Sequence, residues 1–509
     1  MLAKVLSAAL VGLDAHLVEV EVDIGGGLPQ FSVVGLPDAT VRESRDRVRS
    51  ALKNTGFTFP VKKITVNLAP ADLKKEGSGL DLAIAVGILV AGDIVPVEAV
   101  TDRVLVGELS LDGRVKPIAG ALSIGVACRK KQALLLPPEN AAEAAVVEGC
   151  QAYPVHTLPE AVEFLTGKRA IAVATANPLA PSHVQAAEED DFADVKGQEH
   201  AKRALEVAAA GGHNILMIGP PGSGKTMLAR RLPGILPLMA YEEAIETARV
   251  HSVAGLLSGG QALPMVRPFR APHHSISDAG LIGGGAIPRP GEVSLAHHGV
   301  LFLDEIAEFK RHVLDGLRQP LEDGTVMVTR VNASLRYPAR CMLVAAMNPC
   351  PCGYYGDRTR ECQCTPQQIR RYRGRLSGPL LDRLDIHVDV PPVPVRALGG
   401  EGSRESSAAI RERVIEARRR QSARYAHEGI YSNAQLKPRH VKKYCAIESA
   451  GQDLVERAMT RLGLSARAYG RILRVARTIA DLAGADRIDV PHLAEAIQYR
   501  SLDRHADLS

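Results

Sequence analysis

The sequence predicts an α/β protein with two α/β units followed by a helical C-terminal region. Short apolar runs rich in β-branched residues alternate with helical patterns through residues 1–395, as in α/β folds. A glycine-rich loop stands between an apolar run and a helical pattern, the arrangement that nucleotide-binding cores share. Residues 396–509 lack strand patterns and are largely helical in periodicity.

Composition and charge narrow the class further. The chain has 509 residues, enough for about three domains, and its net charge of +5 permits nucleic-acid binding without establishing it. The most apolar stretch, Leu80–Ile94, is short and contains Asp81 and Asp93, so we expect a buried helix and no membrane contact. Without a secretory signal or a disulfide scaffold pattern, a reducing, cytoplasmic location is expected.

Residues 1–167 are predicted to form the first α/β unit. Its expected strands are Val18–Ile24, Phe31–Val34, Lys63–Leu68 and Val104–Glu108, and its expected helices are Arg42–Thr55, Leu80–Ala91, Pro138–Glu148 and Leu158–Leu165. Residues 168–191 break the pattern with alanine, proline, serine and an acidic run, which predicts a linker.

Residues 192–395 are predicted to form the second α/β unit. Its expected core strands are Ile215–Ile218, Val300–Leu303 and Met342–Ala346, with helices over Lys225–Leu232 and ending at Ala210. A second linker is expected at Leu398–Ser407. Residues 396–509 are then mainly helical, with helices predicted at Ser406–His427, Ala446–Leu462, Ala466–Ala483 and Pro491–Gln498.

The glycine-rich loop fits the pattern G-x-x-x-x-G-K-[ST], after a strand and before a helix. Its backbone N–H groups can turn around phosphates, and the helix N-terminus adds a favourable dipole. Lys225 is expected to reach the β- and γ-phosphates of ATP, and Thr226 to ligate Mg²⁺. The predicted nucleotide contacts are Gly219, Pro220, Pro221, Gly222, Ser223, Gly224, Lys225, Thr226 and Asp304.

Polar residues follow two of the predicted core strands. Asp304 and Glu305 end the strand after Gly299, and Asn348 ends the strand that begins at Met342. Asp304 is expected to hold Mg²⁺ together with Thr226, and Glu305 to orient or deprotonate the attacking water. Asn348 is expected to position the same water, although a simple turn residue before a proline is the alternative.

At this point the chain resembles the AAA+ branch that contains magnesium-chelatase motor subunits and MCM helicases. More closely, it resembles the bacterial YifB/ComM family of Mg-chelatase-like proteins, over essentially its whole length. The resemblance is carried by Ser294–Glu305, Ala346–Gly353, Gly378–Asp385 and Leu464–Arg474. It implies an AAA+ P-loop core at residues 192–395 and a C-terminal helical lid at residues 396–509.

The resemblance also implies roles for arginines. Arg383 corresponds to the arginine finger, which acts on the ATP of a neighbouring subunit, so a homo-hexameric ring is implied. Arg467 corresponds to the second sensor of the nucleotide, with Arg471 one turn later as the alternative. A surface salt bridge is the competing interpretation for each. The predicted catalytic residues are Lys225, Glu305, Asn348, Arg383 and Arg467.

Arginines gather between Arg330 and Arg375. This stretch has nine arginines and two acidic residues, with four tyrosines interleaved. Arginine binds phosphates and tyrosine can stack on bases, so DNA is the expected partner, and solvated arginines with subunit contacts are the alternative. A predicted β-hairpin, Thr325–Tyr337, has its tip near Val331–Ala333. In related helicases such a hairpin lines the central pore, which makes Arg330 and Asn332 candidate DNA contacts.

The insert Arg267–His274, continuing through Gly283–Arg289, occupies the other pore-loop region of this branch. Arg267 and Arg270 are therefore further candidate DNA contacts, unless the insertion is purely structural.

Four cysteines have the spacing C-x-C-x₉-C-x-C: Cys350, Cys352, Cys362 and Cys364. Four thiols so close together predict a tetrahedral Zn²⁺ site, with free or redox-active thiols as the alternative.

Residues 1–167 resemble the Lon-protease-like domain, of the ribosomal S5 domain 2-like fold, which also occurs in the RadA recombination protein. Asp81–Val86 and Val106–Ile118 carry this resemblance. The serine nucleophile of such a protease aligns with Gly79, next to Ser78, and its lysine aligns with Leu122. Because a serine nucleophile needs a base, we expect a binding or assembly module rather than a peptidase.

The resemblance implies a function. We expect a hexameric, ATP-driven DNA translocase or helicase that promotes branch migration of recombination intermediates during integration of transforming DNA. Its expected partners are single-stranded and branched DNA and recombination proteins. The alternatives are a protein-remodelling motor of the magnesium-chelatase type, acting on a partner protein, and an ATP-dependent protease.

Overall fold

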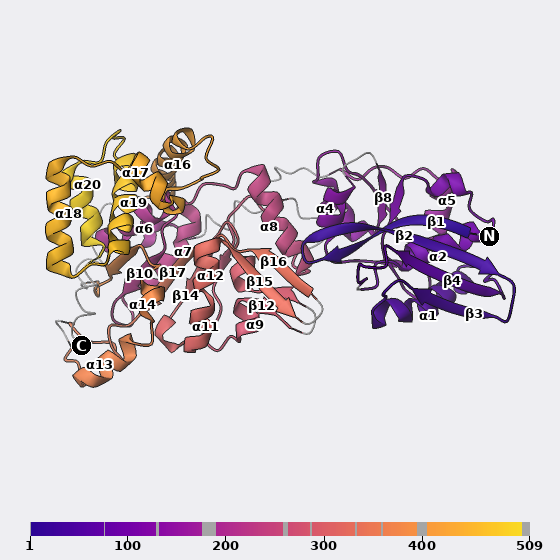
Figure 1. The fold of residues 1–509 in the computed structure, drawn as a ribbon, viewed down its shortest axis with the longest axis horizontal. Coiled ribbons are helices and arrows are strands. Elements are labelled where there is room, and N and C mark those ends of the chain that lie inside the picture. The colour runs from indigo at the N-terminus through magenta and orange to yellow at the C-terminus, as the bar shows by residue number, and fades with distance from the viewer. Residues whose placement is uncertain are drawn as a thin grey trace. The chain divides into compact units, whose positions relative to one another are not determined.

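The computed structural model describes residues 2–75, 77–128, 132–175, 190–257, 263–285, 288–330, 333–357, 360–393 and 405–500 (Figure 1). They form two compact units, Met1–Ser182 with Tyr241–Met265, and His183–Ala240 with Val266–Ser509. Most of the predicted 168–191 linker and of the predicted Leu398–Ser407 linker lies outside the described residues. No described helix combines the length and the apolar character needed to cross a bilayer.

The first unit is built on a seven-stranded sheet of order β3-β4-β2-β1-β5-β8-β9. Its long central pair, β1 with β2, is antiparallel over ten residues, whereas β1–β5, β5–β8 and β8–β9 are parallel. The strands are β1 (Leu2–Val11), β2 (Asp14–Gly25), β3 (Gln30–Val34), β4 (Lys63–Ala69), β5 (Arg103–Leu105), β8 (Ala133–Leu136) and β9 (Gln151–Pro154), with a small ribbon of β6 (Glu108–Leu109) and β7 (Val115–Lys116).

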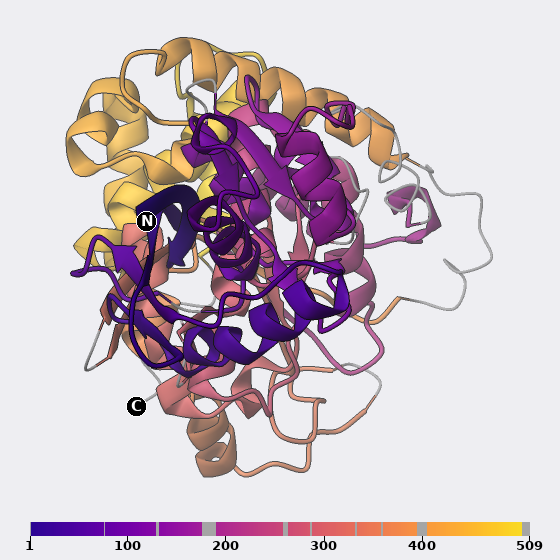
Figure 2. The same cartoon turned by 90° about the vertical axis from the view of Figure 1, so that its right-hand side faces the viewer.

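Helices cover both faces of this sheet, as can be followed in Figure 2. Alternate residues of β1 enter two different cores, because successive side chains of a strand point to opposite faces. One core contains α1 (Ala39–Asn54), α2 (Asp81–Ala91) and α5 (Leu158–Leu165), and the other contains α3 (Ala121–Ala127) and α4 (Pro138–Ala145). Every residue of α2 is buried, which confirms the interpretation of Leu80–Ile94 as a buried helix.

One helix of the first unit comes from a distant part of the chain. Helix α8 (Tyr241–Val253) lies within the residues predicted for the second unit, yet it packs on the first. The Tyr241 hydroxyl donates to the carbonyl oxygen of Val146 at 3.0 Å, and the Arg249 guanidinium contacts a carboxylate oxygen of Asp14 at 2.6 Å. The sequence-based division into residues 1–167, 168–191, 192–395 and 396–509 did not include this crossing.

The second unit contains a five-stranded parallel sheet of order β11-β14-β17-β10-β18. The strands are β11 (Phe269–Arg270), β14 (Val300–Leu303), β17 (Met342–Met347), β10 (Ile215–Ile218) and β18 (Ile386–Asp389). The predicted strands at β10 and β14 match the structure residue for residue, and β17 extends one residue beyond its prediction. The phosphate loop after β10, Asp304 and Glu305 after β14, and Asn348 after β17 therefore all lie at the carboxyl edge of one sheet, where ligands of parallel sheets bind.

Helices and two ribbons surround this sheet. The helices are α6 (Glu199–Gly211), α7 (Lys225–Ile235), α9 (Asp278–Leu281), α10 (Glu292–Leu295), α11 (Arg311–Gly316), α12 (Arg318–Asp323), α13 (Pro366–Arg373) and α14 (Gly378–Leu381). One ribbon pairs β12 (Gly283–Gly284) with β13 (Arg289–Pro290). The other pairs β15 (Thr325–Arg330) with β16 (Ala333–Pro338), which confirms the predicted hairpin.

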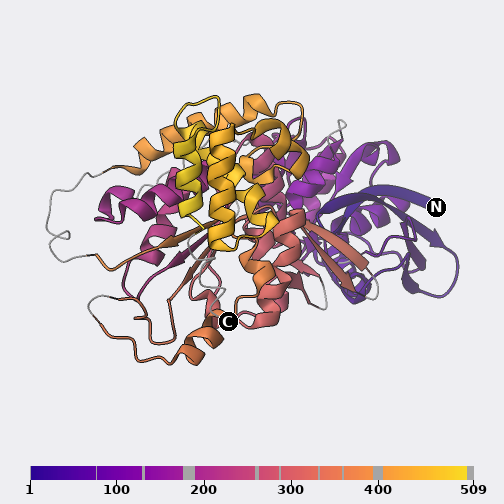
Figure 3. The ribbon, with the colours of Figure 1, turned by 60° about the vertical axis from the view of Figure 1, so that its left-hand side comes forward.

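The C-terminal helices complete the second unit, and Figure 3 shows them in orange and yellow. They are α16 (Ser407–Arg424), α17 (Pro438–Tyr444), α18 (Ser449–Leu462), α19 (Ala466–Leu482) and α20 (Val490–Gln498). One hydrophobic core includes these helices and the sheet. The buried His213 ring bridges them, because its two nitrogens lie 3.3 Å from Asp385 and 2.8 Å from the Thr478 hydroxyl.

Candidate functional site

The predicted phosphate loop connects β10 to α7, so its residues lie at the carboxyl edge of the parallel sheet. The backbone geometry of this loop requires glycine, as Gly219 and Gly224 show. A side chain at Gly219 would place Cβ 2.1 Å from the carbonyl oxygen of Val390. Gly224 has φ of +93°, a conformation that favours glycine, directly before the first residue of α7. The sequence motif and the backbone shape therefore agree.

Lys225 is buried at the start of α7 and joins two of the predicted site segments. Its Nζ donates to the carbonyl oxygens of Gly219 and Pro220 at 2.8 and 2.9 Å, and to Oδ1 of Asn348 at 3.3 Å. Burial lowers the pKa of Lys225, and the charges of Asp304 and Glu305 oppose that shift. Lys225, which is expected to reach the γ-phosphate, thus already contacts Asn348, which is expected to position the attacking water.

The two predicted Mg²⁺ ligands are also paired. The Thr226 hydroxyl donates to Oδ2 of Asp304 at 2.7 Å. The other carboxylate oxygen of Asp304 accepts the backbone N–H of Glu305 at 3.0 Å. Glu305 itself is exposed and has a left-handed backbone, with φ of +49° and ψ of +46°. This conformation turns the chain directly after β14.

The arrangement fits a nucleoside triphosphate with Mg²⁺. The hydroxyl of Ser223 is buried and has no hydrogen-bond partner within the described part of the chain, which suits a group that donates to a phosphate oxygen. In this fit the loop backbone and Lys225 would hold the phosphates, and Thr226 with Asp304 would hold the metal. When bound, Mg²⁺ supplies positive charge that neutralises the charge developing on the phosphoryl group.

The predicted arginines bind within their own chain, and Arg383 stands just before β18, at the amino edge of the sheet, where the Asn214 side chain donates to its carbonyl oxygen at 2.9 Å. Arg383 forms an ion pair with Glu322 at 2.6 Å. Arg467, in the first turn of α19, is exposed and lies 3.4 Å from Asp382. The alternative, Arg471, is buried, and burial lowers its pKa to about 10. The catalytic roles of Arg383 and Arg467 stay predictions.

The four predicted DNA contacts differ in their surroundings. Arg267 donates to the carbonyl oxygens of Pro237 and His298 at 2.8 and 2.7 Å. Arg270 makes two hydrogen bonds, of 2.6 and 2.8 Å, to the Glu292 carboxylate, and these raise its pKa. Both guanidinium groups therefore support the fold.

The other two candidates lie at the hairpin. Arg330 is the last residue of β15, directly before the hairpin tip, and Asn332 lies outside the described residues. The location of Arg330 is the one that the sequence predicted, and its contact with DNA stays a prediction.

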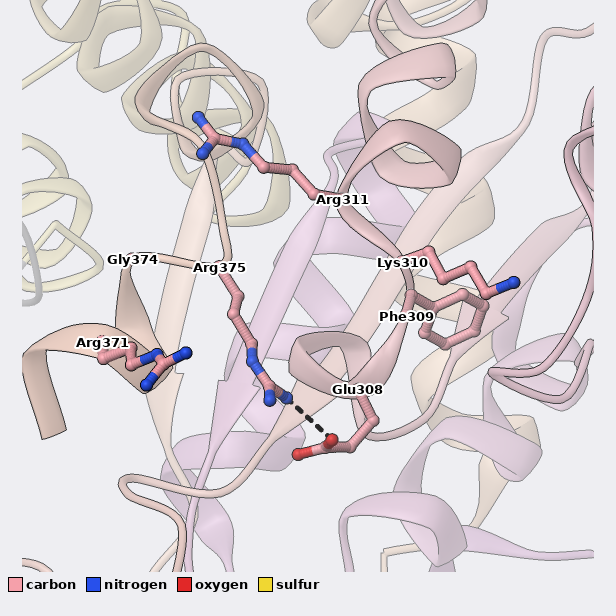
Figure 4. Close-up of a pocket in the computed structure, with 7 residues that line it drawn as sticks. All are labelled: Glu308, Phe309, Lys310, Arg311, Arg371, Gly374 and Arg375. Carbon is pink, nitrogen blue, oxygen red and sulfur yellow. Dashed lines mark hydrogen bonds and ion pairs between the residues drawn. The ribbon is translucent and has the colours of Figure 1, made fainter. Parts of the chain in front are cut away.

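The second unit also has a basic pocket that the sequence did not predict. It has a volume of about 600 Å³ and is drawn in Figure 4, with the ion pair between Arg375 and Glu308, whose atoms lie 2.7 Å apart. Two segments far apart in sequence line it, so no local motif reveals it. One segment follows Glu305 on the chain, and the other ends α13. The lining residues are Glu308, Phe309, Lys310, Arg311, Arg371, Gly374 and Arg375.

The four cysteines converge as the spacing predicts. One ligand atom from each of Cys350, Cys352, Cys362 and Cys364 lies within 4.8 Å of all the others. All four are free thiols. The pKa of Cys352 is lowered to about 6, mainly because the backbone N–H of Tyr354 donates a hydrogen bond to its sulfur.

In the first unit, the protease-like residues do not form a serine–lysine pair. The Ser78 hydroxyl donates to the Glu108 carboxylate, and Leu122 is buried. Asp81 is buried and bonded by Arg47, with 2.7 Å between Nε and Oδ2. A carboxylate in contact with Ser78 could accept its proton, but the lysine base of this protease class is absent from position 122.

Known families match most of the chain. Residues 191–398 match magnesium chelatase, subunit ChlI, residues 20–140 match subunit ChlI of Mg-chelatase, and residues 404–500 match the C-terminal part of that subunit. The magnesium-chelatase 38 kDa subunit of Rhodobacter capsulatus is 26% identical over 329 residues, covering 59% of this chain and 84% of the relative.

Two full-length relatives are more similar. The uncharacterized protein YifB of Escherichia coli is 46% identical over 506 residues, covering 99% of this chain and 98% of the relative. Competence protein ComM of Haemophilus influenzae is 48% identical over 508 residues, with the same coverage of 99% and 98%. Together with the site geometry, these matches show that the chain belongs to the YifB/ComM family of Mg-chelatase-like AAA ATPases.

Proposed function

We propose that this chain is a hexameric, ATP-driven DNA translocase that promotes branch migration of recombination intermediates, with integration of transforming DNA as its setting. The observation that carries the proposal is the connection of the hairpin to the ATP site. Only residues 339–341 separate β16 from β17, and β17 leads directly to Asn348, which contacts Lys225. A change at the γ-phosphate can therefore reach the hairpin through one strand.

Charge at the hairpin and near the ATP site supports DNA as the substrate. Arg330 ends β15 directly before the hairpin tip, and a ring of six copies would bring six such arginines to a central strand. Lys310, Arg311, Arg371 and Arg375 contribute four cations to the basic pocket, against the single carboxylate of Glu308. Such cations bind the phosphate backbone without reading the sequence, as a motor that moves along DNA requires.

The hydrolysis step follows from the site residues. Glu305 would orient the attacking water and accept its proton, and Asn348 would help to position that water beside Lys225. Arg383 of a neighbouring subunit would supply the cation that meets the charge developing on the phosphoryl group. For that role Arg383 must exchange its ion pair with Glu322 for the partner's ATP when the ring forms.

The relatives support the biological setting. The name competence protein ComM belongs to a relative that is 48% identical over nearly its whole length, and competence is the state in which a cell takes up DNA.

The proposal is tested by measuring ATP hydrolysis with no DNA, single-stranded DNA, forked DNA and a four-way junction. Wild type is compared with Glu305→Gln and with Arg330→Ala. We expect junction DNA to stimulate wild type, no stimulation in Glu305→Gln, and unchanged basal hydrolysis but weak stimulation in Arg330→Ala. Wild type that hydrolyses ATP yet shows neither DNA binding nor stimulation contradicts the proposal.

A second candidate function is a protein-remodelling motor. Three matches to the ChlI subunit of magnesium chelatase favour it, because they cover the first unit, the core and the C-terminal region. In that case a partner protein would co-purify with Glu305→Gln, which is expected to trap the ATP-bound state, and would stimulate hydrolysis where DNA does not.

A further inference from the structure

The four-cysteine cluster lies at the end of β17, directly after Asn348. The Sγ atom of Cys350 lies 3.3 Å from that of Cys352 and 3.6 Å from that of Cys362, and Cys352 and Cys362 are also 3.6 Å apart. A disulfide needs about 2.05 Å between its sulfurs. Four sulfurs bound tetrahedrally at about 2.3 Å from one zinc ion would lie about 3.8 Å apart. The observed spacing is therefore close to that of a metal site.

The protein around the thiols is organised as metal sites usually are. The backbone N–H of Tyr355 donates to Sγ of Cys350 at 3.3 Å, and the N–H of Cys364 donates to Sγ of Cys362 at 3.5 Å. Such bonds favour the thiolate form and orient it. The two ends of the segment are fixed by β17 and by α13, whose N-cap, Thr365, has both hydrogen bonds of a capping box.

The same segment touches the ATP site. Gly353 has φ of +88°, and a Cβ on it would meet Cδ of Pro221, in the phosphate loop, at 2.6 Å. The Arg373 guanidinium donates to the carbonyl oxygen of Pro349 at 3.1 Å and stacks on Tyr355, 5.1 Å from the ring centre. The segment is thus held between α13 and the phosphate loop.

We propose that Cys350, Cys352, Cys362 and Cys364 bind one Zn²⁺ as thiolates, and that this ion keeps the cysteine segment packed against Pro221. Zinc would then hold Asn348 in contact with Lys225 and support nucleotide binding. Thiolate ligands in a tetrahedral set select zinc over magnesium or calcium, which prefer oxygen ligands. The proposal concerns the ATP site alone and does not depend on the action on DNA.

The first test is metal content. The full-length chain, purified without added metal or chelator, is analysed for bound metals beside a Cys352→Ser/Cys362→Ser variant and a Cys150→Ser control. Cys150 is a half-buried free thiol of the first unit, so its loss should leave the site intact. We expect one zinc per wild-type or control chain and a loss of bound zinc in the double variant. Iron in place of zinc, or no metal with all four thiols titratable, would overturn the proposal.

A second measurement guards against misfolding of the variant. Wild type is stripped of zinc with a thiol-directed mercurial, treated with dithiothreitol and refilled with Co²⁺. Four thiolates around Co²⁺ give strong sulfur-to-metal charge-transfer absorption, which an oxygen or nitrogen site lacks. Absence of this absorption in protein that keeps its native circular dichroism would contradict a four-thiolate site.

Nucleotide binding tests the connection to the phosphate loop. Binding of a fluorescent ATP analogue is measured for native, zinc-stripped and zinc-restored wild type. A coupling between neighbouring sites changes affinity by about 2- to 30-fold, so we expect weaker binding after stripping and recovery after zinc is restored. Equal affinity in all three samples would show that the metal does not support the ATP site, whatever the metal analysis finds.

Discussion

The phosphate site and the predicted DNA surface were both derived from local sequence, but they differ in the structure. At the phosphate site, Lys225 contacts Asn348 directly and Thr226 contacts Asp304 directly. Among the predicted DNA contacts, Arg270 is bonded to Glu292 instead. The difference arises because the phosphate motif specifies backbone shape and therefore distances. A cluster of positive charge specifies composition only, and each arginine can find a partner inside the chain.

The largest expected effect is on ATP hydrolysis, when Arg383 is replaced. Arg383 is paired with Glu322 in its own chain, whereas a finger must act on a neighbour. We expect Arg383→Ala to lower ATP hydrolysis by about 10³-fold or more while ATP still binds. If the finger acts in trans, mixing Arg383→Ala with Lys225→Ala should restore part of the activity, because some mixed sites have both groups. If the mixed samples are as inactive as each variant alone, Arg383 does not act on the ATP of a neighbouring subunit.

A second prediction concerns Glu305 alone. Glu305→Gln keeps the size and the hydrogen-bonding oxygen but removes the base, so we expect hydrolysis to fall by about 10²- to 10⁴-fold. Binding of an ATP analogue should change little, because Thr226 and Asp304 remain paired. The measurement is steady-state phosphate release beside equilibrium binding. If Glu305→Gln hydrolyses ATP at the wild-type rate, a residue other than Glu305 activates the attacking water.

The Arg330→Ala variant tests the predicted DNA surface at the hairpin. If Arg330 contacts one phosphate, its loss should weaken binding to all DNA sequences and lower the slope of log affinity against log salt by about 1. The measurement is a salt titration of DNA binding. An unchanged slope would show that Arg330 does not contact a DNA phosphate. The next variant to measure would then be Arg371→Ala, in the basic pocket.

Arg270→Ala provides the matched control and the smallest expected effect on DNA. Its guanidinium is already bonded to Glu292, so we expect unchanged DNA affinity. We also expect a loss of stability of about 1–3 kcal/mol, because the half-buried Glu292 carboxylate loses its partner. Thermal unfolding and DNA binding are measured on the same preparation. A fall in DNA affinity without loss of stability would show that Arg270 contacts DNA, as the sequence predicted.

The sequence predicted elements whose signals are local. The strands around the phosphate loop, the β15–β16 hairpin and the meeting of the four cysteines all follow from short-range pattern. It missed β1, because Leu2–Val11 is rich in alanine and leucine, which favour helices, and a ten-residue pairing with β2 overrides that preference. It could not assign α8 to the first unit or find the basic pocket, because both depend on contacts between distant segments.

The left-handed backbone of Glu305 has a consequence for evolution and engineering. A non-glycine residue in this conformation costs about 1–2 kcal/mol, and glycine or asparagine would sit there more easily. Glu305→Gly should therefore raise the melting temperature while removing the carboxylate that the proposed hydrolysis requires. A search for stabilising substitutions in this chain would therefore favour the position whose carboxylate the proposed hydrolysis requires.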